Sequence, residues 1–117
     1  IRKNIKVNGA TILMLGFTFK ENCPDVRNTK IVDVVKSLEE YSTKVTIYDP
    51  WANSDEVKHE YGLTCHATLD SDIKYDAIVL GVAHNEFKIL DLASLKKENA
   101  VVYDVKGVLG SLADAKL

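Results

Sequence analysis

Short apolar runs are the most regular feature of this chain. Residues 11–16 (TILMLG) form a continuous apolar block that ends in glycine, a pattern typical of a strand buried on both faces of a sheet. A second run, Val45–Tyr48, stops at Asp49-Pro50, since proline has no amide hydrogen to donate to a neighbouring strand. The pattern predicts strands at residues 11–16, 45–48, 63–67, 77–82 and 100–103, with 63–67 at an edge.

Two segments between these strands carry helical patterns. In the first, apolar side chains recur every three or four residues, which predicts an amphipathic helix over about residues 29–41 with Asn28 as its N-cap. The second is a short helix over about Ser54–Tyr61. It can end at Gly62, because glycine readily adopts the left-handed conformation that closes a helix.

Strands that alternate with helices predict right-handed βαβ units and a parallel sheet covered on both faces. The fold class is therefore α/β: a three-layer, Rossmann-like domain with a mostly parallel sheet of five or six strands and the first strand near its middle. Ligands of such sheets bind beyond the carboxyl ends of the strands, where the strand order reverses. The loops that follow the first, fourth and fifth strands should meet there, and they carry Lys20, His84 and Lys106.

Composition narrows the class of protein. The 117 residues suffice for one domain, and 15 basic against 17 acidic residues leave no positive surplus for nucleic acid or an anionic membrane. No apolar run approaches the ~20 residues that span a bilayer, and the N-terminus lacks a signal peptide's apolar segment. Cys23 and Cys65 have neither zinc-site nor disulfide-scaffold spacing, so a reducing, cytoplasmic setting is predicted.

The first loop has the chemistry of an anion site but lacks the fingerprint of a dinucleotide site. That fingerprint, G-x-G-x-x-G, needs three glycines, and the chain has GFTFKE instead; Asp49 also lies farther downstream than the usual ~20 residues. Lys20 and Arg27 nevertheless precede a helix whose N-terminus favours anions. The alternative is that both are solvated loop charges, with Arg27 paired to Asp25 or Glu21.

The loop GFTFKENCPDVRNTK resembles the signature of the C-terminal domain of UDP-glucose/GDP-mannose dehydrogenases. The resemblance continues through YDPW at 48–51, YDAIVLGVAHNEF at 75–87 and YDVKG at 103–107, so it covers essentially the whole chain. It implies that residues 1–8 end a preceding inter-domain segment and that 9–117 form a domain that binds a UDP-sugar. The chain also begins without Met, as an excised domain would.

The resemblance also implies an activity and a set of site residues. Members oxidise the C6 alcohol of a nucleotide sugar to a carboxylate with NAD⁺. Phe19, Lys20 and Lys106 would contact the UDP-sugar, and Arg27 would reach NAD held by an N-terminal domain. The catalytic cysteine of the family belongs to a central part outside these residues, so no catalytic or metal-binding residue is predicted here. The chain alone should be inactive, and the parent enzyme should form a homo-oligomer through that central part.

Particular sequence motifs indicate a branch of the family. FKENCPDVRN, DPW and AHNEF resemble the branch that oxidises UDP-N-acetylhexosamines for surface-polysaccharide synthesis, and Lys106 stands where UDP-glucose members typically have arginine. Lysine keeps the charge but loses the bidentate geometry of arginine. The alternatives are a UDP-glucose 6-dehydrogenase domain, a free-standing flavodoxin-like regulatory module, or an assembly domain.

Five other residues draw attention. Cys23 and Cys65 are interpreted as structural, and Trp51 is expected to pack over the end of the sheet. His84 either contacts a ligand or caps its loop through backbone groups, with the second interpretation favoured. Asp104 either orients Lys106 or merely ends a strand, and it is left unassigned.

Overall fold

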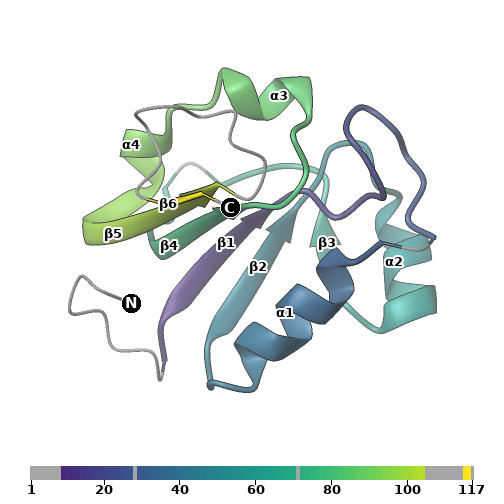
Figure 1. Cartoon of the computed structure of the whole chain (residues 1–117), viewed down its shortest axis with the longest axis horizontal. Helices are drawn as coiled ribbons and strands as arrows, with labels where there is room; N and C mark the ends of the chain where they lie inside the picture. Colours follow the sequence, from purple (N-terminus) through teal and green to yellow (C-terminus); the bar gives the residue numbers. More distant parts are fainter. Residues whose placement is uncertain (1–8, 28, 71, 105–114, 117) are drawn as a thin grey trace.

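A computed structural model describes residues 9–27, 29–70, 72–104 and 115–116, which form a six-stranded sheet with the order β3-β2-β1-β4-β5-β6 (Figure 1). Every neighbouring pair of these strands is parallel. The strands are β1 (Thr11–Leu15), β2 (Lys44–Tyr48), β3 (Cys65–His66), β4 (Tyr75–Leu80), β5 (Lys96–Asp104) and β6 (Ala115–Lys116). The predicted parallel α/β sheet, with its first strand in the middle, is confirmed.

In the described part of the chain, four helices cover the two faces of the sheet: α1 (Ile31–Glu39), α2 (Ser54–Tyr61), α3 (Asn85–Lys88) and α4 (Leu92–Leu95). Successive side chains of a strand point to opposite faces. Leu13 and Leu15 of β1 accordingly pack in a core with residues of α3 and α4. Met14, between them, packs in a second core with residues of α1 and α2. These are the three predicted layers, and Figure 1 shows α1 and α3 on opposite sides of the sheet.

The ends of α2 follow their sequence signals. Asn53 caps its N-terminus by accepting a hydrogen bond from the amide of Glu56 (3.0 Å), and Gly62 closes it in the left-handed conformation with φ 70°. The other predicted helix is shorter than expected, since α1 begins at Ile31 and ends at Glu39. The Thr29 hydroxyl accepts from the amide of Ile31 (3.1 Å), and the predicted cap, Asn28, lies outside the described residues.

Two further elements were not predicted at all. α3 and α4 are four residues each, about one turn, which is too short for an apolar period to show. No helix among the described residues combines the length and the apolar character needed to cross a bilayer.

Gly16 brings the ends of β1 and β4 together. It follows β1 with φ 96°, a conformation that favours glycine, and a Cβ at this position would lie 2.6 Å from the Cβ of Val82. Its amide donates to the carbonyl of Tyr48 at 2.9 Å, so β2 is joined at the same point. The chain therefore leaves β1 in close contact with both neighbouring strands.

Gly16 and Gly62, which both have positive φ, provide a matched test of this contact. Gly16→Ala should lower the free energy of unfolding by about 3 kcal/mol, because it adds steric overlap with Val82 to the cost of a left-handed alanine. Gly62→Ala should cost only about 1 kcal/mol, since no atom lies within 4 Å of its added Cβ. Urea denaturation of the two variants measures the difference, and equal losses would contradict it.

Candidate functional site

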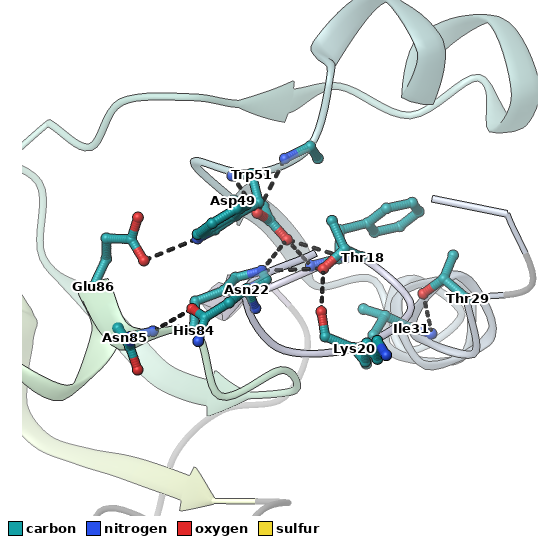
Figure 2. A network of polar contacts seen from close by, with 12 residues as sticks. Thr18, Lys20, Asn22, Thr29, Ile31, Asp49, Trp51, His84, Asn85 and Glu86 are labelled. Atoms are coloured by element: carbon teal, nitrogen blue, oxygen red, sulfur yellow. Dashed lines mark hydrogen bonds and ion pairs between the residues drawn. The ribbon is translucent and has the colours of Figure 1, made fainter. Parts of the chain in front are cut away.

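Three loops meet beyond the carboxyl ends of the central strands. They follow β1, β2 and β4, and Figure 2 shows that polar side chains and backbone groups from all three converge on one point. This is where the strand order reverses, because β2 and β4 flank β1 on opposite sides. The predicted convergence of the first and fourth strand loops is confirmed, whereas the loop that carries Lys106 lies outside the described residues.

The Asp49 carboxylate lies at the centre of this point and is completely buried. Its Oδ2 accepts hydrogen bonds from the amides of Phe17 (2.6 Å) and Thr18 (3.0 Å) in the β1–α1 loop. Its Oδ1 accepts from the amides of Trp51 (2.8 Å) and Ala52 (3.2 Å) in the loop after β2. One side chain thus fixes the backbone of two loops.

His84, also fully buried, adds the third loop. Its Nε2 lies 2.9 Å from Oδ2 of Asp49 and 3.1 Å from the hydroxyl of Thr18, and its Nδ1 accepts from the amide of Asn22 at 2.8 Å. A backbone N–H can only donate, so Nδ1 must present a lone pair and the proton must lie on Nε2. His84 is therefore the neutral tautomer that donates to Asp49.

This set of donors keeps the Asp49 carboxyl ionised. Burial by itself raises the pKa of Asp49, but hydrogen bonds from His84 and from the amides of Phe17 and Thr18 outweigh it and leave that pKa below its ordinary value. At neutral pH the centre of the site consequently holds a buried negative charge.

Asn22 joins the loop after β1 to the loop after β4. It has φ 54°, an uncommon conformation that asparagine tolerates better than most residues. Its amide donates to His84, and its Oδ1 accepts from the amide of Asn85 at 3.0 Å. Both backbone and side chain of Asn22 are thus used to hold the two loops together.

The remainder of the β1–α1 loop is held from the other side. Val26 is fully buried, and its carbonyl accepts a hydrogen bond from the Tyr61 hydroxyl of α2 at 2.6 Å. Between these attachments the amide of Phe19 donates to the carbonyl of Asp25 at 2.7 Å, which closes the loop on itself.

The part of the loop that faces solvent carries two of the predicted site residues. Phe19 is 54% exposed, and Lys20 beside it is exposed as well. The backbone at Lys20 is fixed, because its carbonyl accepts from the Thr18 hydroxyl at 3.0 Å. A held loop therefore presents an aromatic face and a positive charge to solvent, a combination that suits a nucleobase and a phosphate.

Residues 13–111 match the UDP binding domain of the UDP-glucose/GDP-mannose dehydrogenase family. The chain belongs to this family. It is 50% identical over 112 residues to UDP-N-acetyl-D-glucosamine 6-dehydrogenase of Salmonella typhi, covering 93% of this chain and 26% of that relative. The Pseudomonas aeruginosa protein of the same name is 46% identical over 112 residues, with the same coverage. The chain thus spans about a quarter of the length of these relatives.

A solved structure from the same class of enzymes shares the fold. NDP-N-acetyl-D-galactosaminuronic acid dehydrogenase from Methanosarcina mazei superposes with a TM-score of 0.75 at 24% identity, over 88% of this chain and 22% of that one. At this identity the likeness concerns the fold alone.

Arg27, predicted to reach NAD, is not part of the buried network. Its Nε donates to Oδ1 of Asp25 at 3.1 Å, and its side chain is 81% exposed. The alternative that paired Arg27 with Asp25 is thus confirmed as the arrangement of this loop. The guanidinium faces solvent, so the pair leaves it accessible to a ligand.

The turn after β1 does not fit the pyrophosphate of NAD. In a glycine-rich dinucleotide turn the backbone approaches the pyrophosphate closely, and the phosphates sit on amide donors. Here the amides of Phe17 and Thr18 point at Asp49, and Val82 fills the space beside Gly16. An internal carboxylate therefore occupies donors that a dinucleotide site would need.

Two side chains near the network have structural roles. The ring of Trp51 stacks on His84 with centroids 5.9 Å apart, and its Nε1 donates to Oε1 of Glu86 at 2.9 Å, so the expected packing over the sheet end is confirmed. Cys65 is buried, which raises the pKa of its thiol to about 12 and keeps it protonated. Cys23, in the β1–α1 loop, is half-buried and free.

Sequence reasoning missed the partnership of Asp49 and His84. Nothing in the motif at residues 49–51 indicates a charge partner, because the bond joins side chains 35 residues apart. The available signal was topological, because both residues follow strands that flank β1. For His84, the favoured interpretation as a loop cap is confirmed through its bond to the Asn22 amide. Asp104 is buried at the end of β5.

Replacement of the central charge should show how much the fold depends on it. Asp49→Asn should lower the free energy of unfolding by about 3 kcal/mol, because one oxygen becomes an amide donor that faces backbone donors. Asp76→Asn is the control: that carboxylate lies near the surface and accepts from the amide of Thr11, and its loss should cost about 1 kcal/mol. Chemical denaturation at neutral pH measures both.

The stability loss in Asp49→Asn should also depend on pH. The folded-state pKa of Asp49 is lowered, so its stabilisation is complete above the unfolded pKa of ~3.9 and is lost as the pH falls through the folded value. The stability gap between the parent chain and Asp49→Asn should therefore close as the pH is lowered below about 4. A gap that stays constant into strong acid would show that Asp49 contributes through something other than its charge.

Proposed function

We propose that this chain is the nucleotide-sugar-binding domain of an NAD-dependent UDP-sugar 6-dehydrogenase that oxidises a C6 alcohol to a carboxylate for surface-polysaccharide synthesis. The observation that carries this proposal is the family match over residues 13–111. The two relatives described above, at 50% and 46% identity, are both UDP-N-acetyl-D-glucosamine 6-dehydrogenases, which favours a UDP-N-acetylhexosamine as the substrate. Residues 9–117 would form this domain and residues 1–8 the end of the segment before it.

The solvent-facing part of the β1–α1 loop would bind the nucleotide end of the substrate. Lys20 supplies a positive charge for the diphosphate, and the exposed ring of Phe19 supplies an apolar face. Lys106 would add a second charge from the loop after β5. Because the backbone of the β1–α1 loop is held at Thr18, Asn22 and Val26, Phe19 and Lys20 would be in place before the substrate arrives.

This chain would contribute to the rate by positioning. Binding energy gained at the UDP end holds the distant C6 atom in reacting geometry without any contact between this domain and C6. NAD⁺, when bound, accepts the hydride from C6, and Arg27 would contact it from this side. The glycine-rich NAD loop and the reacting cysteine would lie in other domains of a homo-oligomeric parent enzyme, so this chain alone would be inactive.

Lys20 and Arg27 should affect different ligands. In the full-length enzyme, Lys20→Ala should raise KM for the UDP-sugar about tenfold, the effect of one lost charge-assisted hydrogen bond, with KM for NAD⁺ nearly unchanged. Arg27→Ala should raise KM for NAD⁺ and leave KM for the UDP-sugar nearly unchanged. Lys58→Ala, an exposed charge on α2, is the control and should leave both constants unchanged. If both site variants shift both constants equally, the proposed division of roles is wrong.

The identity of the sugar is tested by comparing kcat/KM for two candidate substrates. We expect the full-length enzyme to have a higher kcat/KM for UDP-N-acetylglucosamine than for UDP-glucose, because the more similar relatives share that substrate name and Lys106 replaces the arginine of UDP-glucose members. Steady-state kinetics with both sugars under one set of conditions measures this ratio. A preference for UDP-glucose would refute the proposed substrate class while leaving the reaction type intact.

A further inference from the structure

The ring of His84, in the loop after β4, bonds both of the other loops of this network. Its ring touches Asp49 after β2 and both Thr18 and Asn22 in the β1–α1 loop. It is also enclosed by two aromatic rings: Trp51 stacks on it at 5.9 Å, and Phe87 lies at 5.3 Å with a tilt of 55°. Burial on every side leaves the imidazole little freedom to find other hydrogen-bond partners.

We propose that His84 is a positioning residue for nucleotide-sugar binding, and that it holds the Phe19–Lys20 segment in its binding conformation only while its ring is neutral. The proposal rests on the proposed function for the ligand, but the effect on the loop stands on geometry alone. His84 touches the backbone at Asn22, two residues beyond Lys20.

The two nitrogens of the ring would respond differently to a proton. At Nδ1, protonation places an N–H against the amide of Asn22, 2.8 Å away, and two donors cannot share that distance. At Nε2 the bond to Asp49 gains charge and becomes stronger. Protonation should therefore detach the loop at Asn22 while the contact between the β2 and β4 loops persists.

Asn22 is suited to move once this bond is lost. Its positive φ is a costly conformation that surrounding contacts must maintain. Once the bond to His84 is lost, the bond from the amide of Asn85 to the half-buried Asn22 side chain would remain. The Phe19–Lys20 segment would keep the bonds to the Asp25 carbonyl and the Thr18 hydroxyl, but it would lose its nearest attachment on the C-terminal side. The bound ligand would then meet a less ordered surface.

The groups that face His84 from the neighbouring elements define its electrostatic surroundings. Asp49 is the charged group in direct contact, and hydrogen bonds lower its pKa, so it stays ionised at neutral and mildly acidic pH. Glu86 lies beyond Trp51, which it binds through Nε1. Tyr48 packs on Phe87, and burial raises the pKa of its hydroxyl, so it stays neutral.

The test compares a titratable ring with a neutral substitute. In His84→Gln, one amide nitrogen and one amide oxygen can replace the donor and the acceptor of the ring, but the side chain cannot take up a proton. His59→Gln, on the exposed surface of α2, is the control for removal of a histidine. The first readout is the hydrogen-exchange protection factor of the Asn22 amide in this 117-residue chain, with the Gly81 amide, bonded to the Leu15 carbonyl, as an internal reference.

Between about pH 8 and about pH 5.5, protection of the Asn22 amide should fall about fivefold in the parent chain and in His59→Gln, the equivalent of one lost hydrogen bond. Protection in His84→Gln should stay flat, and protection of Gly81 should not change in any variant. The proposal is overturned if the parent chain and His84→Gln follow the same course, or if Gly81 loses protection together with Asn22.

The second readout is the dissociation constant for UDP-N-acetylglucosamine, measured by calorimetry on the full-length enzyme. This probe has a pyrophosphate diester that does not titrate in the range used. The dissociation constant should rise about fivefold on acidification in the parent and stay flat in His84→Gln. If exchange responds as expected but no UDP-sugar binds at any pH, the proposed function fails while the effect on the loop stands. If the sugar binds but neither readout distinguishes His84→Gln, the positioning role fails while the proposed function stands.

Discussion

The site depends on the solvation of one buried charge. A carboxylate that is removed from water must receive hydrogen bonds from the protein, or it costs several kcal/mol. Asp49 receives four from backbone amides and one from His84. Because these donors come from the loops after β1, β2 and β4, the requirement of a single side chain brings three separate loops to one place. The geometry beyond the sheet is therefore a consequence of satisfying that charge.

The same interaction explains how this domain departs from a dinucleotide-binding one. Both have a turn after the first strand and an acid after the second. Here the acid turns inward and takes the amides of Phe17 and Thr18, while Gly16 lets the turn lie against Val82. The backbone donors are then used within the protein, so recognition of an outside anion has to rely on side chains. Phe19 and Lys20, which remain exposed, are suited to that role.

The sequence predicted those features of the fold that depend on residues close together along the chain. Continuous apolar runs located the central strands, and Asn53 and Gly62 marked the ends of α2 through capping chemistry. Local patterns do not encode single turns, so α3 and α4 were missed. They also do not show which distant side chains meet, so the bond between Asp49 and His84 was not foreseen. The family resemblance singled out Phe19, Lys20 and Arg27, but their packing and pairing required the structure.

The network and the exposed loop residues are subject to different physical constraints. Within the network each donor faces a matched acceptor, and no buried side-chain nitrogen or oxygen among the described residues lacks a partner. A change at Asp49, His84 or Asn22 that does not supply the same donors and acceptors would leave an unmatched group inside the protein, so these positions are coupled. Phe19 and Lys20 are not constrained in this way, since their side chains are exposed to solvent. Their backbones are held by the Asp25 carbonyl and the Thr18 hydroxyl. The proposed ligand surface can thus change in sequence without loss of the scaffold beneath it, which would allow one fold to serve enzymes with different nucleotide sugars.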